Sequence, residues 1–327
     1  MHQGLRTLLA LVLILSSISV SSSSSSDLSP DFYAFTCPNV QLFVRNTVSF
    51  FSTNDGTIPG KLLRLVFHDC MVEGCDASVL IQGNGTERTD PANLSLGGFD
   101  VVESAKRLIE VMCPGIVSCA DILVLAARDA VEFTGGPLVQ VPLGRKDGRV
   151  SLASNVRPNI IDTSFSVEEM AKTFSSKGLS MEDLVVLSGG HTIGLSHCTS
   201  FSDRFQKDAN GSMVPIDTSM EKNFASELMK KCSANATAVT TVSCDPVTPN
   251  QFDNQYFTNL LNGKGLLRSD SELVNDPKAE ALIDSFSKSQ NSFFDSWAES
   301  FIKMTSIGVK TGDDEGEIRT VCSSANG

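Results

Sequence analysis

The sequence predicts a mainly helical protein, and three observations support this. Apolar residues recur at helical spacing in stretches distributed along the chain. Segments rich in Gly, Pro and Asn separate these stretches, for example 56–60, 134–137 and 244–250. Few of the alternating runs that are typical of strands lie between them. The predicted helices are 40–52, 100–112, 118–133, 166–177, 181–187, 254–261 and 277–305.

The helix at 118–133 has the clearest start. Ser118 is a residue type that caps helix N-termini. Asp121 stands three residues later, where an acid complements the free N–H groups and the positive end of the helix dipole. The apolar segments 62–70 and 183–188 are also interpreted as helical.

Length and composition leave room for one large core or two small ones. Of the 327 residues, 41% are apolar and 20% charged, which excludes a disordered chain and a disulfide miniprotein. The 26 Lys and Arg stand against 38 Asp and Glu, giving a net charge of -12. This charge disfavours nonspecific binding to nucleic acid or anionic lipid, so we expect neither partner.

Residues 1–26 are expected to be a signal peptide, because the apolar run 8–20 follows Arg6 and is too short to span a bilayer. All 9 cysteines lie beyond this segment, and in a secreted chain we expect disulfides with one cysteine left over. Counting leaves the pairing open, and the lack of a Cys-x2-Cys pair disfavours a zinc ribbon. Glycosylation sequons stand at Asn84, Asn93, Asn210 and Asn235.

Arg64 and His68 form the first candidate pair for chemistry. They are four residues apart, so a helix places a fixed cation and a base on one face of an apolar segment. Burying a guanidinium is costly unless an anionic group needs it, which favours a functional pair. A satisfied core histidine beside an arginine that reaches solvent is the alternative.

His191 is the second candidate, because it follows Gly189 and Gly190 at the end of an apolar segment. Glycines lack side chains, so we expect a flat, bulky group such as a haem to approach the backbone there. By itself this position leaves a structural histidine as an open alternative. Ser188 lacks a Gly-x-Ser-x-Gly elbow and no HExxH motif occurs, which disfavours serine hydrolases and zinc proteases.

Six motifs follow one another along the chain: LLRLVFHDC (62–70), GCDAS (74–78), VSCADILVLAARD (117–129), VPLGRKDG (141–148), LSGGHTIG (187–194) and TPNQFDNQYF (248–257). Together they resemble the secretory plant haem peroxidases of class III. The resemblance extends over 27–322 and implies a haem-peroxidase fold, with two helical domains on either side of one haem b. The distal part would be about 27–160, the proximal part about 161–322, and 323–327 a short tail.

The resemblance implies roles for the two histidines and their neighbours. His191 would bind the haem iron, and Asp270 would accept its other N–H and increase its donation to the metal. On the opposite face, His68 would take a proton from hydrogen peroxide and return it to the departing oxygen. Arg64 would stabilise the negative charge that develops, and Phe67 would line the haem.

Asn93 is implied to accept the N–H of His68 and to keep that ring basic, with support from Glu87. This role places Asn93 in the interior, so its sequon is expected to carry no glycan. Asn84, Asn210 and Asn235 are the remaining candidates for glycosylation.

Two calcium ions are also implied, held by carboxylate, hydroxyl and carbonyl oxygens. The distal ligands would be Asp69, Val72, Gly74, Asp76 and Ser78, and the proximal ligands Thr192, Asp245, Thr248, Gln251 and Asp253. The implied disulfides are Cys37–Cys113, Cys70–Cys75, Cys119–Cys322 and Cys198–Cys232, which leave Cys244 free.

The chain departs from the family pattern at three places. The Leu-Pro-x-Pro stretch at the donor edge of the haem is replaced by NVRPNIID (155–162), where only Pro158 remains and Arg157 is expected to favour anionic phenolates. Cys244 replaces a bulky apolar residue near the proximal histidine. Met71 stands where an aromatic residue is commoner.

The sequence therefore predicts a secreted, monomeric haem peroxidase that oxidises small phenols with hydrogen peroxide. The expected location is the apoplast or cell wall, with the vacuole as the alternative. Two hypotheses from other classes are a haem-fold binding protein without redox activity and a structural cell-wall glycoprotein. The intact set of Arg64, His68, Asn93, His191 and Asp270 weighs against both.

Overall fold

The computed structural model describes residues 28–209, 213–232 and 239–326. The expected signal peptide and the sequons at Asn210 and Asn235 lie outside these ranges. Within them, no helix has the length and apolar character needed to cross a membrane.

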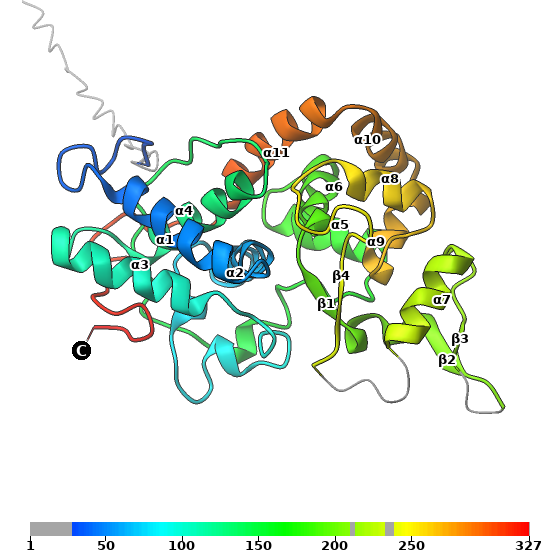
Figure 1. Ribbon diagram of the computed structural model, residues 1–327. Helices are drawn as coiled ribbons and strands as arrows, with labels where there is room; N and C mark the ends of the chain where they lie inside the picture. Colours follow the sequence, from blue (N-terminus) through cyan, green and yellow to red (C-terminus); the bar gives the residue numbers. More distant parts are fainter. Residues whose placement is uncertain (1–27, 210–212, 233–238, 327) are drawn as a thin grey trace, which may run out of the picture.

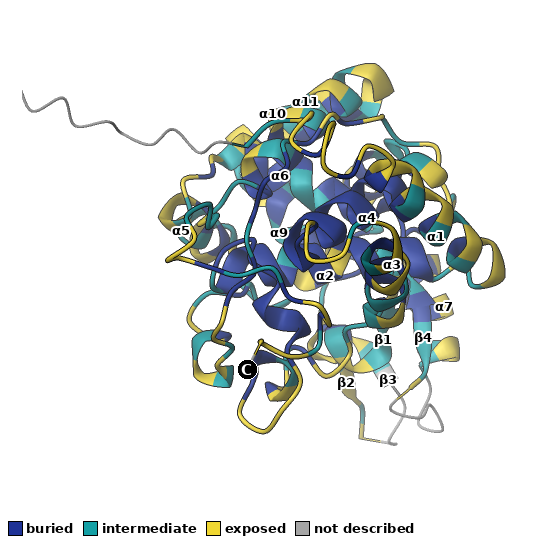
Figure 2. Cartoon of the chain, turned by 90° about the vertical axis from the view of Figure 1, so that its left-hand side faces the viewer, coloured by how far each residue is buried: buried dark blue, intermediate teal, exposed yellow. Residues whose placement is uncertain are grey.

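The first half of the chain is built on four helices, α1 (Val40–Asn54), α2 (Ile58–Val72), α3 (Phe99–Met112) and α4 (Cys119–Phe133). Helix α4 packs against α1, α2 and α3, and it is buried from Cys119 to Val131. Figure 2 shows α2 and α4 as dark ribbons in the middle of the molecule. His68 on α2 is therefore buried, whereas Arg64 on the same helix is exposed.

The second half contains α5 (Val167–Ser176), α6 (Met181–Ser188), α8 (Gln255–Leu261), α9 (Arg268–Glu272), α10 (Pro277–Lys288) and α11 (Gln290–Met304). Helix α10 packs on α6 and α8, and α11 packs on α6 (Figure 1). Short 3-10 helices connect the longer elements of both halves: η1 (Ser78–Leu80), η2 (Glu87–Thr89), η3 (Ala153–Asn155), η4 (Gly189–Thr192), η5 (Cys198–Arg204) and η6 (Leu273–Asn275).

A smaller unit with one α-helix and four short strands among its described residues lies at one side of the second half (Figure 1). It contains α7 (Lys222–Lys231) and two antiparallel pairs, β1 (Leu195–His197) with β4 (Thr241–Ser243) and β2 (Phe205–Lys207) with β3 (Met213–Pro215). Its apolar residues form a cluster separate from the main core, with Phe201, Phe224 and Leu228 among its members. The sequence analysis predicted none of these elements.

The prediction of a mainly helical chain is confirmed, and so is the cap at Ser118, whose side chain accepts the N–H of Asp121 at 3.1 Å. The single helix predicted over 277–305 is wrong, because it is two helices that meet at Ser289. Ser289 has an extended backbone (φ -144°, ψ 100°), and its side chain caps α11 by accepting the N–H of Ser292. A serine at this position favours the cap over helix continuation.

The end of the chain returns to the first half. Cys322 forms a disulfide with Cys119 at the start of α4, and Asp147 pairs with Glu317 through an isolated bridge. All four implied disulfides are present, the others being Cys37–Cys113, Cys70–Cys75 and Cys198–Cys232, and Cys244 is free. One continuous hydrophobic core spans both halves. It includes Cys37 and Cys322, whose disulfides link the segments near each end of the described chain to the helices of the first half.

Candidate active site

His68 is buried on α2 and bonded to a neutral partner. Its Nδ1 lies 2.7 Å from Asn93 Oδ1, and the Asn93 amide nitrogen donates to the Glu87 carbonyl at 2.9 Å. The second bond turns the amide oxygen toward His68, so the ring carries its hydrogen on Nδ1 and a lone pair on Nε2. Burial and then the charge of Arg64 lower the pKa of His68 to about 3, and the Asn93 bond offsets part of this. The ring is therefore a neutral base at neutral pH.

Arg64 lies one turn before His68 on the same helix. Its guanidinium donates to Ser95 Oγ at 2.8 Å and to the Ala92 carbonyl at 3.1 Å, and both partners are neutral. The side chain has accessible surface, yet burial lowers its pKa. Because both partners are neutral, the positive charge of Arg64 is available to stabilise negative charge close to His68.

His191 lies on η4, directly after α6, and is bonded to a carboxylate. Its Nδ1 is 2.9 Å from Asp270 Oδ1, and Asp270 is buried. Burial alone would lower the pKa of His191, but the Asp270 carboxylate outweighs this effect and the opposing charge of Arg64, so the pKa is raised. The side chain remains 43% accessible, and Nε2 forms no hydrogen bond in the part of the chain that the structure describes. These features are typical of a metal-binding histidine.

The two histidines lie on elements that contact each other. The charge of Arg64, on α2, acts on the pKa of both His191 and Cys244 in the second half of the chain. The turn that carries His191 packs on α2, which lies between the two halves in Figure 1. Phe67, beside His68, contacts Phe174 of α5 with ring centroids 6.5 Å apart. Residues predicted from distant motifs are thus brought together.

Gly189 and Gly190 leave room for the aromatic rings of α11. A Cβ on Gly189 would lie 2.8 Å from the ring of Phe293, and a Cβ on Gly190 would lie 3.2 Å from Trp297. Both rings belong to α11, so the glycines allow this helix to pack against the turn that presents His191. These contacts lie on the side of the turn that faces α11, and the expectation that a flat cofactor approaches the backbone beside His191 stays a prediction.

The five residues predicted to bind proximal calcium converge. Thr192 Oγ1 lies 3.1 Å from Asp253 Oδ1 and 3.5 Å from the Gln251 carbonyl. Thr248 Oγ1 lies 3.2 Å from Asp253 Oδ1 and 3.3 Å from Asp245 Oδ2. Nowhere among the described residues do three His, Cys, Asp or Glu side chains meet as a metal site. This cluster instead combines two carboxylates with hydroxyl and carbonyl oxygens, a donor set that suits calcium.

The predicted distal calcium ligands include two neighbouring buried acids, Asp69 and Asp76. Burial, followed by the charges of Asp76 and Glu87, raises the pKa of Asp69 well above its usual value. Ser78 Oγ is buried nearby and lacks a hydrogen-bond partner of normal geometry among the described residues. A bound cation would relieve the repulsion and satisfy the hydroxyl, so these residues fit calcium.

Two lysines contact the distal cluster, and the sequence analysis predicted neither. The Lys310 ammonium forms an ion pair with Asp76, and Lys177 donates to the Val72 carbonyl at 3.3 Å. The Gly74 carbonyl accepts the N–H of Asp76 at 2.8 Å. No side-chain cation pairs with Asp245 or Asp253 in the described ranges, so the two clusters differ in local charge.

The segment at the expected donor edge is held by ion pairs. Arg157 lies 3.3 Å from Asp90 and 3.6 Å from Asp162, and its side chain is 53% accessible, while Pro158 is exposed. Two carboxylates offset much of the positive charge of Arg157, so the expected preference for anionic phenolates stays a prediction of small size.

The Cys244 thiol and the two described sequons, at Asn84 and Asn93, differ in exposure. Burial and then the charge of Asp270 raise the pKa of Cys244 to about 12, so the thiol stays protonated. Met71 is fully buried on α2. Asn93 is 3% exposed, which suits an unused sequon, whereas Asn84 is exposed.

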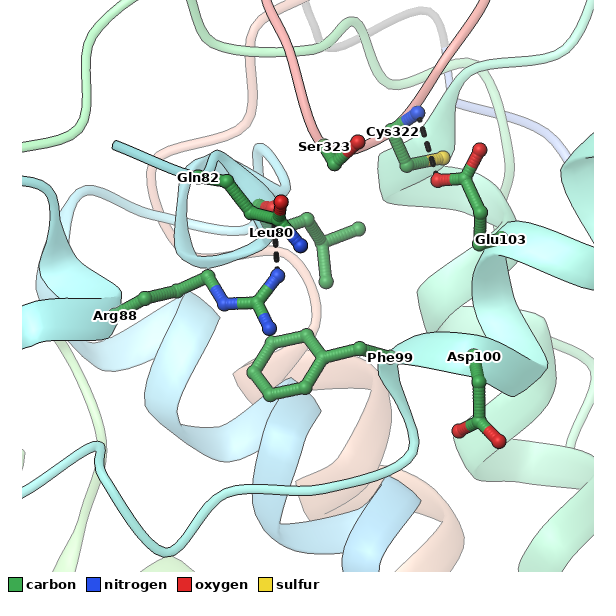
Figure 3. A pocket seen from close by; sticks show the side chains of 8 residues that line it. All are labelled: Leu80, Gln82, Arg88, Phe99, Asp100, Glu103, Cys322 and Ser323. Carbon is green, nitrogen blue, oxygen red and sulfur yellow. Dashed lines mark hydrogen bonds between the residues drawn. The ribbon is translucent and has the colours of Figure 1, made fainter.

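A separate pocket of about 310 Å³ lies in the first half, between η1, α3 and the C-terminal segment. Figure 3 shows Arg88 over the ring of Phe99, and the guanidinium carbon is 3.7 Å from the ring centroid. On the opposite wall, Glu103 accepts the N–H of Cys322 at 3.1 Å. Both charge signs line this pocket and none of its residues belongs to the candidate site, so we assign it no chemistry.

Sequence reasoning missed several residues that hold the candidate groups. Tyr256 donates its hydroxyl to Asp270 Oδ1 at 2.9 Å, and the Leu267 N–H donates to Oδ2 at 3.3 Å. Ser95 orients Arg64 as described above. Tyr256 lies inside the motif 248–257 among mostly polar neighbours, so nothing in the local sequence indicated that its hydroxyl would be buried and need a partner.

Fold and site together define a mainly helical protein with two imidazoles on contacting elements, one paired with an amide and the other with a carboxylate. The peroxidase family model matches residues 44–289. Over 306 residues the chain is 57% identical to peroxidase 18 of Arabidopsis thaliana, covering 93% of each protein. It is 55% identical to peroxidase 46 of the same plant, covering 98% of the chain and 97% of the relative.

The chain therefore belongs to the peroxidase family, and the resemblance to the plant enzymes is confirmed. It is a peroxidase that reduces hydrogen peroxide while oxidising a donor. Haem and calcium are typical of this family.

Proposed function

We propose that one haem b lies between the two halves, with His191 Nε2 as its iron ligand and His68 on the opposite face. The observation that carries this proposal is that each ring has its Nδ1 in a hydrogen bond, while its Nε2 has no hydrogen-bond partner among the described residues. The turn that carries His191 also packs on α2, which carries His68. When bound, the haem would supply the iron that binds peroxide and stores the oxidising equivalents. Phe67 would line its edge.

His68 moves a proton between the two peroxide oxygens. Its neutral Nε2 accepts the proton of the oxygen that approaches the metal and delivers it to the other oxygen, which leaves as water. Overall, one hydrogen peroxide and two donor molecules give two waters and two donor radicals. Because Asn93 holds Nδ1–H, the ring keeps one tautomer throughout the transfer. Glu87 supports this geometry through its backbone carbonyl.

Arg64 and Asp270 supply the charges that the reaction needs. Arg64 is held by neutral groups, so its positive charge is available to the oxygen that becomes negative as the O–O bond breaks. Asp270 fixes the ring of His191 and makes it a stronger donor to a metal. Arg64 thus acts on the departing peroxide oxygen, whereas Asp270 acts on the ring that would bind the iron.

We propose one calcium ion in each oxygen cluster. The proximal ion would be held by Thr192, Asp245, Thr248, Gln251 and Asp253, and the distal ion by Asp69, Val72, Gly74, Asp76 and Ser78. Asp69 adjoins His68 and Thr192 adjoins His191, so each ion would stiffen the backbone beside one histidine.

We further propose that the donors are small phenols that bind near Pro158, and that the protein works as a secreted monomer in the apoplast or cell wall. The proposed division is a distal domain of about 27–160 and a proximal domain of about 161–322. The disulfides support secretion.

A spectroscopic titration tests the proposed function. Purified protein supplied with haem is expected to show a Soret band that shifts with equimolar hydrogen peroxide and returns with guaiacol. A band that stays unchanged would favour a haem-binding protein without redox activity. The absence of any band would favour a structural glycoprotein.

A further inference from the structure

Asp270 receives three hydrogen bonds, and two of them converge on one oxygen. Oδ1 accepts from His191 Nδ1 at 2.9 Å and from the Tyr256 hydroxyl at 2.9 Å, while Oδ2 accepts the Leu267 N–H at 3.3 Å. The carboxylate is 4% accessible, so water contributes little to its solvation. Its negative charge is therefore shared mainly among protein donors.

Sharing one oxygen makes the two donors compete. Each hydrogen bond to a carboxylate draws electron density toward its own proton, so the Tyr256 bond reduces what Asp270 lends to His191. Burial, followed by the charge of Asp270, raises the pKa of Tyr256 well above its ordinary value. Tyr256 therefore stays protonated at neutral pH, and its hydroxyl donates to Asp270.

Packing holds Tyr256 in this position. The residue is 4% exposed on α8, and its ring packs edge-on against Phe257 with centroids 5.2 Å apart. The ring also lies edge-on to His191 at 6.2 Å. Helix α8 begins two residues after Asp253 of the proximal oxygen cluster. The segment that carries this cluster therefore also positions the Tyr256 hydroxyl.

We propose that Tyr256 is a positioning residue that limits the anionic character of His191 and thereby raises the reduction potential of the iron. This inference rests on the proposed ligation of haem by His191. It assigns Tyr256 no contact with substrate, because its effect passes through Asp270.

The Tyr256→Phe variant tests the inference, and the chain offers a matched control. The sequence holds 2 tyrosines, and Tyr33 also donates to a buried acid, Asp121, at 2.8 Å. Tyr33→Phe thus removes an equivalent bond away from His191. In haem-loaded Tyr256→Phe we expect the iron–histidine stretching frequency to rise in resonance Raman spectra. At a fixed applied potential, the ratio of reduced to oxidised iron should fall about threefold to tenfold, as expected for loss of one ordinary hydrogen bond.

Tyr33→Phe should leave both readouts at their wild-type values. A Tyr256→Phe protein with the wild-type frequency and potential would overturn the inference. A wild-type protein that binds haem through another ligand, or binds none, would instead overturn the proposed ligation. The two failures are therefore distinguishable.

A second measurement avoids dependence on how well Tyr256→Phe folds. In the Tyr33→Phe background, 3-fluorotyrosine labels only position 256 and makes its hydroxyl a stronger donor. The iron–histidine frequency should then fall, which is opposite to the change in Tyr256→Phe. An unchanged frequency would contradict the inference. In an Asp270→Asn background the same label should have no effect, and a persistent shift would show that Tyr256 acts by another route.

Discussion

His68 and His191 are the same side chain in two halves of one molecule, and they differ in the partner of Nδ1. Asn93 offers His68 a neutral amide oxygen, and the pKa of that ring is lowered to about 3. Asp270 offers His191 a carboxylate, and the pKa is raised. Burial lowers the pKa of both rings, and the carboxylate of Asp270 reverses this shift at His191 whereas the amide of Asn93 offsets only part of it at His68. The comparison shows that the partner of Nδ1 decides the direction in which the pKa shifts.

Removing the distal base is expected to have the largest effect. In His68→Leu, no group accepts the peroxide proton, so the second-order rate constant for hydrogen peroxide should fall about 10²- to 10⁴-fold. Stopped-flow absorbance at neutral pH measures this constant. His197→Gln is the control, because His197 lies on β1 outside the site. Equal losses in both variants would mean that His68 has no special role.

Exchanging the partner of the distal ring tests the comparison directly. In the wild type, His68 is neutral above its pKa of about 3, so the peroxide rate should stay level from pH 8 down to about pH 4. Asn93→Asp gives this ring a carboxylate, which should raise its pKa to the ordinary range or above. At pH 5 most of the rings would then be protonated, and the rate should drop about 10- to 100-fold.

Stopped-flow rates from pH 3 to pH 8 measure this change, and Asn84→Asp provides a control on an exposed asparagine. The loss should disappear at high pH, where the variant ring is again neutral. A pH profile identical to that of the wild type would show that the partner does not set the protonation of His68.

The two oxygen clusters provide a third test, because Lys310 pairs with Asp76 in the distal cluster alone. An ammonium beside a calcium ligand repels the ion, so Lys310→Met should bind one of two calcium ions about tenfold more tightly. Competition with a chromophoric chelator measures both affinities. Lys288→Met removes an exposed pair with Asp284 and should change neither. Equal affinities in wild type and Lys310→Met would contradict the charge argument.

Local spacing explains which parts of the site could be predicted. Arg64 and His68 are one helical turn apart, so their common face on α2 followed from the sequence itself. The pairing of His191 with Asp270 joins residues 79 positions apart and came only through the family resemblance. The calcium clusters and disulfides were likewise implied by motifs rather than by composition.

Tertiary contacts explain what could not be predicted. Lys310 reaches Asp76 across 234 positions, and no periodicity or motif relates them. The break between α10 and α11 depends on a side-chain cap at Ser289 within an otherwise helical pattern. The strands β1 to β4 are three residues each, too short for an alternating pattern to be visible.

The smallest effect is expected for Arg157 at the proposed donor edge, a segment outside the hydrogen-bond partners of the two histidines. Arg157 is about half exposed and pairs with Asp90 and Asp162, so Arg157→Ala leaves two acids without their shared cation. Efficiency with ferulate should fall about two- to threefold relative to neutral guaiacol, as expected for an exposed ion pair. Steady-state rates at low ionic strength measure the ratio, and added salt should reduce the difference. Equal changes for both donors would show that this segment acts through shape rather than charge.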